Sequence, residues 1–261
     1  MLHYSLDLFT LGAREFVRTD MRTGERLANF KKFGKGDIVM GDRIYGTLPG
    51  IAYLKGLGAE YALRIKSRGF RIYDNKKQEI DLLGSLSSLK EGEIADMPVK
   101  CRINDQYEPV RICALRKEQG SERAGLKRLT KENQRKQGGK EVSSLQGENN
   151  KYIIVATSLG KEASACQVME LYRMRCQIEI AFKRLKSLFQ YNDLPSENGE
   201  SVKAWFYGKL LLAALCETLV NTGRFSPSGG VRRGREASPC RADELVEGTV
   251  CRACDGWGNA G

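Results

Sequence analysis

Short apolar segments separated by polar turns recur over the first 157 residues, and this pattern constrains the fold more than any other feature. Each segment is too short for an ordinary helix, and most are rich in β-branched or aromatic residues. The segments expected to form strands lie at residues 2–9, 13–17, 38–42, 61–65, 70–73, 99–103, 109–115 and 151–157. We expect the first two to pair with each other.

Two longer segments with helical periodicity follow the last expected strand. They cover residues 163–190 and 202–221. The chain is therefore expected to combine strands in its first part with helices after them. With 261 residues, the chain is long enough for one large domain or two small ones.

The composition changes after residue 222. Residues 223–261 contain no Lys, Ile or Met and show no periodicity, which predicts a disordered tail. Cys240, Cys251 and Cys254 lie in this tail, but a closed zinc site needs four ligands. Unstructured thiols are therefore the favoured interpretation over a zinc site.

The chain is strongly basic. Its 43 Lys and Arg residues exceed its 32 Asp and Glu residues, which gives a formal net charge of +11. Such an excess favours a polyanionic partner, with nucleic acid as the first candidate and a membrane surface as the second. Residues 116–140 hold nine basic residues against three Glu residues. This segment is expected to be partly helical, and it is either a solvated face or a surface that contacts phosphates.

Several protein classes are excluded at this stage. The longest uncharged apolar run, residues 210–216, is far below the roughly 20 residues that span a bilayer, and the N-terminus does not resemble a secretory signal. We therefore expect a cytoplasmic protein with reduced core cysteines. His3 is the one histidine, which argues against a serine hydrolase or a zinc protease. We expect His3 to be a strand residue.

One candidate catalytic residue is Asp42. It ends the apolar run that begins at Ile38, and ligands of open α/β sheets gather at the carboxyl ends of strands. The alternative is a loop aspartate that starts a turn before Tyr45 and Gly46.

Another candidate, Glu179, lies on the helical segment 163–190. At about 100° per residue, Tyr172, Arg175, Glu179 and Lys186 share a stripe about 60° wide, next to an apolar face. A carboxylate flanked by cations at the edge of a core is a plausible acid site. The alternative is a surface helix with i,i+4 ion pairs such as Arg175 with Glu179.

The spacing Tyr-x2-Arg-x3-Glu-x6-Lys resembles the signature around the last acid of the DDE transposases of bacterial insertion sequences. The segment Gly41–Gly46 is similar to the one that carries the second catalytic Asp of that family. The resemblance implies an α/β fold with an RNase H-like mixed sheet and a β-rich insertion. It divides the chain into the start of the catalytic core (1–59), the insertion with the basic segment (60–150), the end of the core with the signature helix (151–222) and a tail that is foreign to the family (223–261).

The resemblance also implies a chemistry. Asp42 and Glu179 would be catalytic ligands of two Mg²⁺ or Mn²⁺ ions, which activate water and then a 3′-hydroxyl for attack on a phosphodiester. Oxygen ligands suit these metals, so no histidine is required. The residues expected to bind DNA are Tyr172, Arg175, Lys186, Arg43, Lys127 and Arg128. The implied partners are double-stranded DNA, as transposon ends and target, and a second copy of the chain in a homodimer.

The chain departs from the family pattern at its start. The strand that carries the family's first Asp would precede residues 2–8, so the first strand of the sheet is expected to be missing, and Asp7 is a poor substitute. These departures predict an inactive fragment of marginal stability. The alternative is a non-catalytic DNA-binding remnant that acts through its basic patches, and an RNA-binding accessory protein ranks last.

Overall fold

The computed structural model describes residues 2–9, 13–19, 22–136, 141–187, 198, 200–202, 204–205, 207–212 and 215. These residues belong to two compact units. The larger unit is Glu25–Arg173, and the smaller one combines described residues that precede Glu25 with others that follow Arg173. The tail from residue 223, with its three cysteines, lies outside the described residues.

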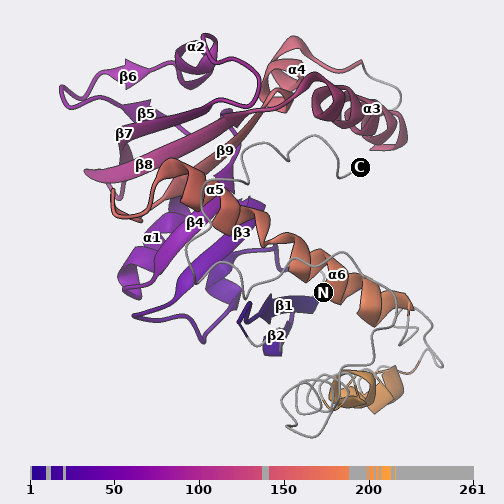
Figure 1. Ribbon diagram of the computed structural model, residues 1–261. Coiled ribbons are helices and arrows are strands. Elements are labelled where there is room, and N and C mark those ends of the chain that lie inside the picture. Colours follow the sequence, from indigo (N-terminus) through magenta and orange to yellow (C-terminus); the bar gives the residue numbers. More distant parts are fainter. Residues whose placement is uncertain are drawn as a thin grey trace, which may run out of the picture. The chain divides into compact units, whose positions relative to one another are not determined.

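The larger unit is built on a seven-stranded mixed sheet (Figure 1). The strand order is β3-β4-β9-β8-β7-β5-β6, and only β3 and β4 are parallel. The strands are β3 (Ile38–Gly46), β4 (Glu60–Ile65), β5 (Ile72–Tyr73), β6 (Glu79–Ile80), β7 (Ile94–Ile103), β8 (Gln106–Arg116) and β9 (Tyr152–Thr157). The sequence predicted β3, β4, β5, β7, β8 and β9 with shifted ends, but it did not predict β6.

The helix α1 (Leu48–Gly56) makes the crossover between the parallel strands β3 and β4. Its N-cap, Thr47, accepts a hydrogen bond from the backbone N–H of Gly50, which satisfies one of the free donors of the first turn. Ile51 and Leu54 are fully buried against the sheet and belong to its main hydrophobic core. The sequence analysis missed this helix because its short apolar run lies between two turns.

The strand β3 differs from its prediction. It continues to Gly46, so Asp42 lies inside a strand and neither ends the strand nor starts a loop. Regular parallel pairing with β4 ends at Gly41 and returns only at Gly46, so the intervening residues are irregular. A Cβ at residue 46 would lie 1.8 Å from the carbonyl oxygen of Arg64, so the pairing returns where the chain has no side chain.

The opposite face of the sheet is covered by α5 (Ala165–Arg173) (Figure 1). Val168, Met169 and Tyr172 of this helix pack on Ala62, Cys113, Leu115 and Val155 of the sheet. The loop from β9 to α5 is held by Arg111 of β8. The Arg111 guanidinium forms two hydrogen bonds with the Asp96 carboxylate, and it donates to the carbonyls of Leu159, Gly160 and Ala163.

The single helix predicted for residues 163–190 is wrong. The structure has two helices, α5 and α6 (Cys176–Ser187), with a turn at Met174 and Arg175. The carbonyls of these two residues accept i→i+3 hydrogen bonds from Gln177 and Ile178, which is the tighter geometry of a 3₁₀ turn. The periodicity of side chains does not record such a change in backbone hydrogen bonding.

The basic segment forms α3 (Gln119–Lys136), which confirms its partly helical character. It packs against α4 (Ser144–Asn150), a short helix with a capping box formed by Ser143 and Gln146. Figure 1 shows the two helices side by side near one end of the sheet.

The smaller unit contains the pair of strands expected at the start of the chain. β1 (Leu2–Leu6) and β2 (Ala13–Arg18) are antiparallel, with Tyr4 stacked on Phe16. His3 lies in β1, which confirms the expected strand position. It is buried, and its Nε2 lies 2.8 Å from the Thr19 hydroxyl. Within the described parts of the chain, no helix has the length and apolar character needed to cross a membrane.

The close approach of Gly46 to β4 yields a stability prediction. Gly46→Ala is expected to lower the free energy of unfolding by about 1–3 kcal/mol, because the new Cβ collides with the Arg64 carbonyl. Gly56→Ala is the matched control, since a Cβ there meets no atom within 4 Å and alanine favours the helix. Urea denaturation measures both, and equal destabilisation of the two variants would contradict the prediction.

The hydrogen bonds of the Arg111 guanidinium yield a second stability prediction. Arg111→Lys is expected to cost about 2–4 kcal/mol, because an ammonium group cannot bridge a carboxylate and three carbonyls at once. The control is Arg102→Lys, an exposed ion pair with Asp105, for which less than about 1 kcal/mol is expected. Equal denaturation midpoints for the two variants would show that the loop does not depend on the guanidinium.

Candidate active site

Asp42 is partly buried in the irregular part of β3. Its Oδ1 is buried and has no hydrogen-bond partner among the described residues. A buried carboxylate oxygen without a donor is costly, so native proteins rarely keep one unless it binds something. Carboxylate oxygens are the ligands that Mg²⁺ and Mn²⁺ prefer, and Asp42 therefore fits the role of a metal ligand.

Negative charge gathers around this end of β3. The pKa of Tyr45 is raised to about 12, first because the hydroxyl is buried, and further because the charges of Glu25 and Asp42 disfavour a tyrosinate. The two carboxylates thus act on the same hydroxyl from different parts of the unit.

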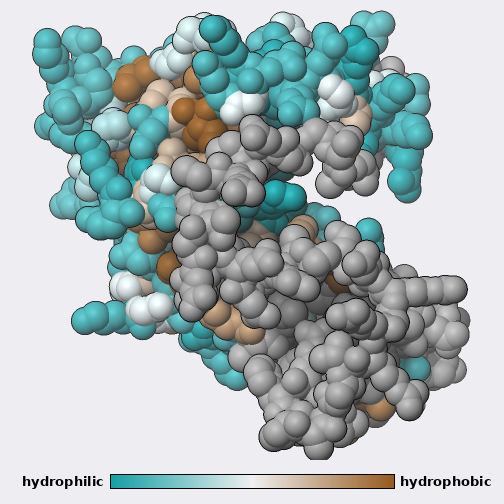
Figure 2. Space-filling model, in the orientation of Figure 1, coloured by the Kyte–Doolittle hydropathy of each residue, from teal (hydrophilic) through white to brown (hydrophobic). Residues whose placement is uncertain are grey.

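Arg43 follows Asp42 in the strand and is partly buried, whereas Lys127 and Arg128 are exposed on α3. Figure 2 shows that the surface over α3 and α4 is almost entirely hydrophilic. The charges of Arg43 and Arg128 both lower the pKa of Lys117, so the fold gathers Arg43 and Arg128 around one amino group. The sequence analysis named Arg43 and Arg128 but not Lys117, because the three residues lie apart in the chain, on β3, after β8 and on α3.

Tyr172 lies on α5 with its ring 5% exposed in the second hydrophobic core. Its side chain therefore packs against the sheet. The DNA contact that the resemblance implies for this residue stays a prediction.

Arg175 and Glu179 form an ion pair of 2.8 Å between Nη1 and Oε1 at the start of α6, which confirms the i,i+4 pairing considered for this helix. The Glu179 side chain is 58% exposed, whereas that of Arg175 is 21% exposed. Lys186 lies on the last turn of α6. Because of the turn at residues 174 and 175, Tyr172 is on a different helix from Glu179 and Lys186.

Among the residues that the structure describes, no group of three or more His, Cys, Asp or Glu side chains could hold a metal ion. Asp42 belongs to the larger unit and Glu179 to the smaller one. The fit of the residues to a divalent metal therefore rests on the chemistry of each carboxylate.

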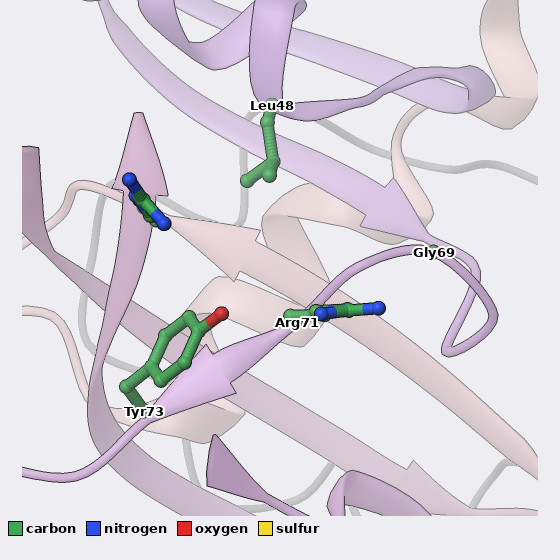
Figure 3. Close-up of a pocket in the computed structure, with 5 residues that line it drawn as sticks. Leu48, Gly69, Arg71 and Tyr73 are labelled. Atoms are coloured by element: carbon green, nitrogen blue, oxygen red, sulfur yellow. The ribbon is translucent and has the colours of Figure 1, made fainter. Parts of the chain in front are cut away.

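A separate pocket of about 250 Å³ was missed by the sequence analysis. Leu48, Gly69, Arg71, Tyr73 and Arg102 line it, and Figure 3 shows Leu48, Arg71 and Tyr73 around the hollow. Both arginines have exposed acidic neighbours, Glu79 and Asp105. None of the predicted site residues lines this pocket. Single basic residues, Arg71 before β5 and Arg102 on β7, give no spacing from which this pocket could be predicted.

The chain is similar to several curated transposases. It is 32% identical over 226 residues to the transposase for insertion sequence element IS421 of Escherichia coli, a match that covers 84% of this chain and 60% of that protein. It is 26% identical over 235 residues to the transposase for insertion sequence element IS231E of Bacillus thuringiensis subsp. finitimus, which covers 80% of this chain and 48% of that protein. The chain thus spans only about half to three fifths of the length of these relatives.

No solved structure matches the chain. The mixed α/β fold with its seven-stranded sheet is consistent with an RNase H-like DDE transposase domain. The family model described as "Transposase DDE domain" matches residues 17–215, most of the chain, and the chain therefore belongs to the DDE transposase domain family.

Proposed function

We propose that this chain is part of an insertion-sequence DNA transposase that cleaves and transfers DNA strands with the help of divalent metal ions. The observation that carries the proposal is the buried Oδ1 of Asp42, which has no donor among the described residues and belongs to the segment that resembles the family's second catalytic Asp. Glu179, the acid of the family-like spacing, is the other proposed ligand. The relatives are named as transposases of insertion sequences, which supports the same role here.

Bound Mg²⁺ or Mn²⁺ would activate water and the freed 3′-hydroxyl and stabilise charge on the phosphate. The chain's own residues would hold the metal and the DNA. The Oδ1 of Asp42 has no hydrogen-bond partner among the described residues, so no side chain would have to be displaced before it binds a metal ion. Glu179, in contrast, is paired with Arg175. We propose that Glu179 would hold the metal and that the Arg175 guanidinium would donate a two-pronged hydrogen bond to a DNA phosphate.

The proposed partners are double-stranded DNA, as element ends and target, and a second copy of the chain. Arg43, Lys127, Arg128 and Lys186 are proposed phosphate contacts. Since the Tyr172 ring is buried, we propose that its main contribution is to seat α5 on the sheet, directly before the turn that leads to Arg175.

DNA binding without cleavage is the second candidate function. The exposed basic surface of α3 favours it, because it offers phosphate contacts that do not depend on the carboxylates. Both candidates expect salt-sensitive DNA binding, and only the first expects metal-dependent strand cleavage.

Metal binding is the first test. Mn²⁺ at ten times its Kd is expected to raise the melting temperature of the chain by about 3–6 °C. Asp42→Asn is expected to abolish most of this shift and to leave the metal-free protein as stable as the wild type or more so, because Oδ1 has no donor to lose among the described residues. Glu179→Gln is expected to reduce the shift. Asp105→Asn, a change at an exposed carboxylate, is the matched control and should keep the full shift.

Nicking of supercoiled plasmid in Mg²⁺ or Mn²⁺ separates the two candidates. Metal-dependent nicking that is lost in Asp42→Asn and Glu179→Gln but kept in Asp105→Asn would support the transposase function. DNA binding without nicking would favour the second candidate. A Mn²⁺ shift that is identical in all three variants would refute the assignment of Asp42 and Glu179 as metal ligands.

A further inference from the structure

Lys117, which directly follows β8, is held in one place by the end of α4. Its Nζ donates to the backbone carbonyl of Asn150 at 2.5 Å and lies 3.3 Å from Asn150 Oδ1. Its backbone N–H donates to the carbonyl of Lys151 at 2.9 Å, which extends the pairing of β8 with β9. A surface lysine is usually mobile, so this fixed ammonium group calls for an explanation.

Asn150 also fixes α3 next to Lys117. It is 5% exposed, and its Nδ2 donates to the carbonyl of Glu122 at 2.7 Å. A Cβ at Gly125 would lie 2.2 Å from Asn150 Oδ1, so the helix backbone rests directly on the asparagine amide. One buried side chain therefore positions both Lys117 and the basic helix.

Arg64 joins the same region from β4. It pairs in register with Val155 of β9, which pairs with Cys113 of β8, and the latter two belong to the core under α5. Lys117 lies four residues beyond Cys113, so Arg64 and Lys117 share the α5 face near one end of the sheet. Arg64 is partly buried.

More cations than carboxylates act on Lys117. Its pKa is lowered to about 8, first by burial and then by the charges of Arg64, Arg43 and Arg128, which come from β4, β3 and α3. Glu122 of α3 acts in the opposite direction, but its carboxylate is paired with Arg116 at 3.3 Å. Three arginines and one carboxylate therefore act on the Lys117 amine, and a polyanion bound beside it would stabilise its charged form.

We propose that Arg43, Arg64, Lys117 and Arg128 form a phosphate-binding cluster for the DNA backbone, and that Arg43 joins this cluster to Asp42 in the neighbouring position of β3. The inference rests on the proposed function in taking DNA as the ligand. The hydrogen bonds to Asn150 position the Lys117 amino group, and its third N–H can donate to a phosphate oxygen. DNA binding then favours the protonated amine, so the free protein takes up a proton above about pH 8 when it binds.

The sign of the pH effect follows from this. Below pH 8 Lys117 is charged in the free protein and binding needs no extra proton. As the pH rises through about 8, protonation must accompany binding, so affinity is expected to fall by about tenfold at pH 9 relative to pH 7. The three arginines stay charged over this range.

The test is fluorescence anisotropy of the full chain with a labelled 30-base-pair duplex in EDTA, so that metal binding does not contribute. Lys117→Gln and Arg64→Gln are each expected to weaken binding about tenfold at pH 7, and each is expected to reduce the slope of log K against log salt by about 0.9. Lys117→Gln should also remove the loss of affinity between pH 7 and pH 9. Lys117→Arg should restore affinity and make it independent of pH, which a merely structural role for Lys117 would not produce.

Lys90→Gln is the charge-matched control, because Lys90 is exposed and outside the cluster. It is expected to change affinity less than twofold and to keep both the salt slope and the pH dependence. Thermal melts of every variant show whether it is folded. Equal binding by the Lys117, Arg64 and Lys90 variants would overturn the inference and leave the proposed function intact. If the wild-type protein binds no duplex at low salt, both this inference and the proposed function are overturned.

Discussion

The guanidinium of Arg111 is the interaction on which the arrangement of the larger unit depends. It lies in the middle of the sheet, nearly buried, and it connects Asp96 on β7 to three carbonyls in the loop that leads into α5. The Asp96 carboxylate balances its charge, and this hydrogen-bonded pairing holds the pKa of Asp96 below its ordinary value. Because the loop is fixed, α5 can bury Val168, Met169 and Tyr172 on the second face of the sheet. Without that face, the sheet would have a core on one side only.

The candidate acid lies where this regular construction is interrupted. β3 and β4 form the one parallel pair of the sheet, and their pairing lapses at Asp42 and returns at Gly46. Two residues around the gap have a packing reason, since a Cβ at Gly41 would collide with Leu63 and one at Gly46 with the Arg64 backbone of β4. The Oδ1 of Asp42, in contrast, is buried without a hydrogen-bond partner among the described residues. A functional site commonly shows this combination, in which a well-packed frame holds one polar group that folding does not use.

Two fields of opposite sign lie close together in the same unit. Glu25 and Asp42 act on the Tyr45 hydroxyl, while Arg43, Arg64 and Arg128 act on the Lys117 amine. Asp42 and Arg43 are adjacent residues of β3, so the strand itself joins the two fields. In the proposed function, the carboxylates would hold a metal ion and the cations a phosphodiester, and a DNA-cleaving enzyme needs the two at neighbouring points.

The sequence by itself determined most strands and the helical character of the basic segment, and it named Asp42 and Glu179 as candidate acids. Periodicity of apolar residues records which face of an element is buried, and this is a local property. It could not record the turn at Met174 and Arg175, because that turn changes backbone hydrogen bonds without disturbing the pattern of side chains. Only the tertiary structure placed Asp42 inside β3 and gathered Arg43, Arg64, Lys117 and Arg128 from four separate segments, since strand pairing and the Asn150 contact with α3 act between residues far apart in the chain.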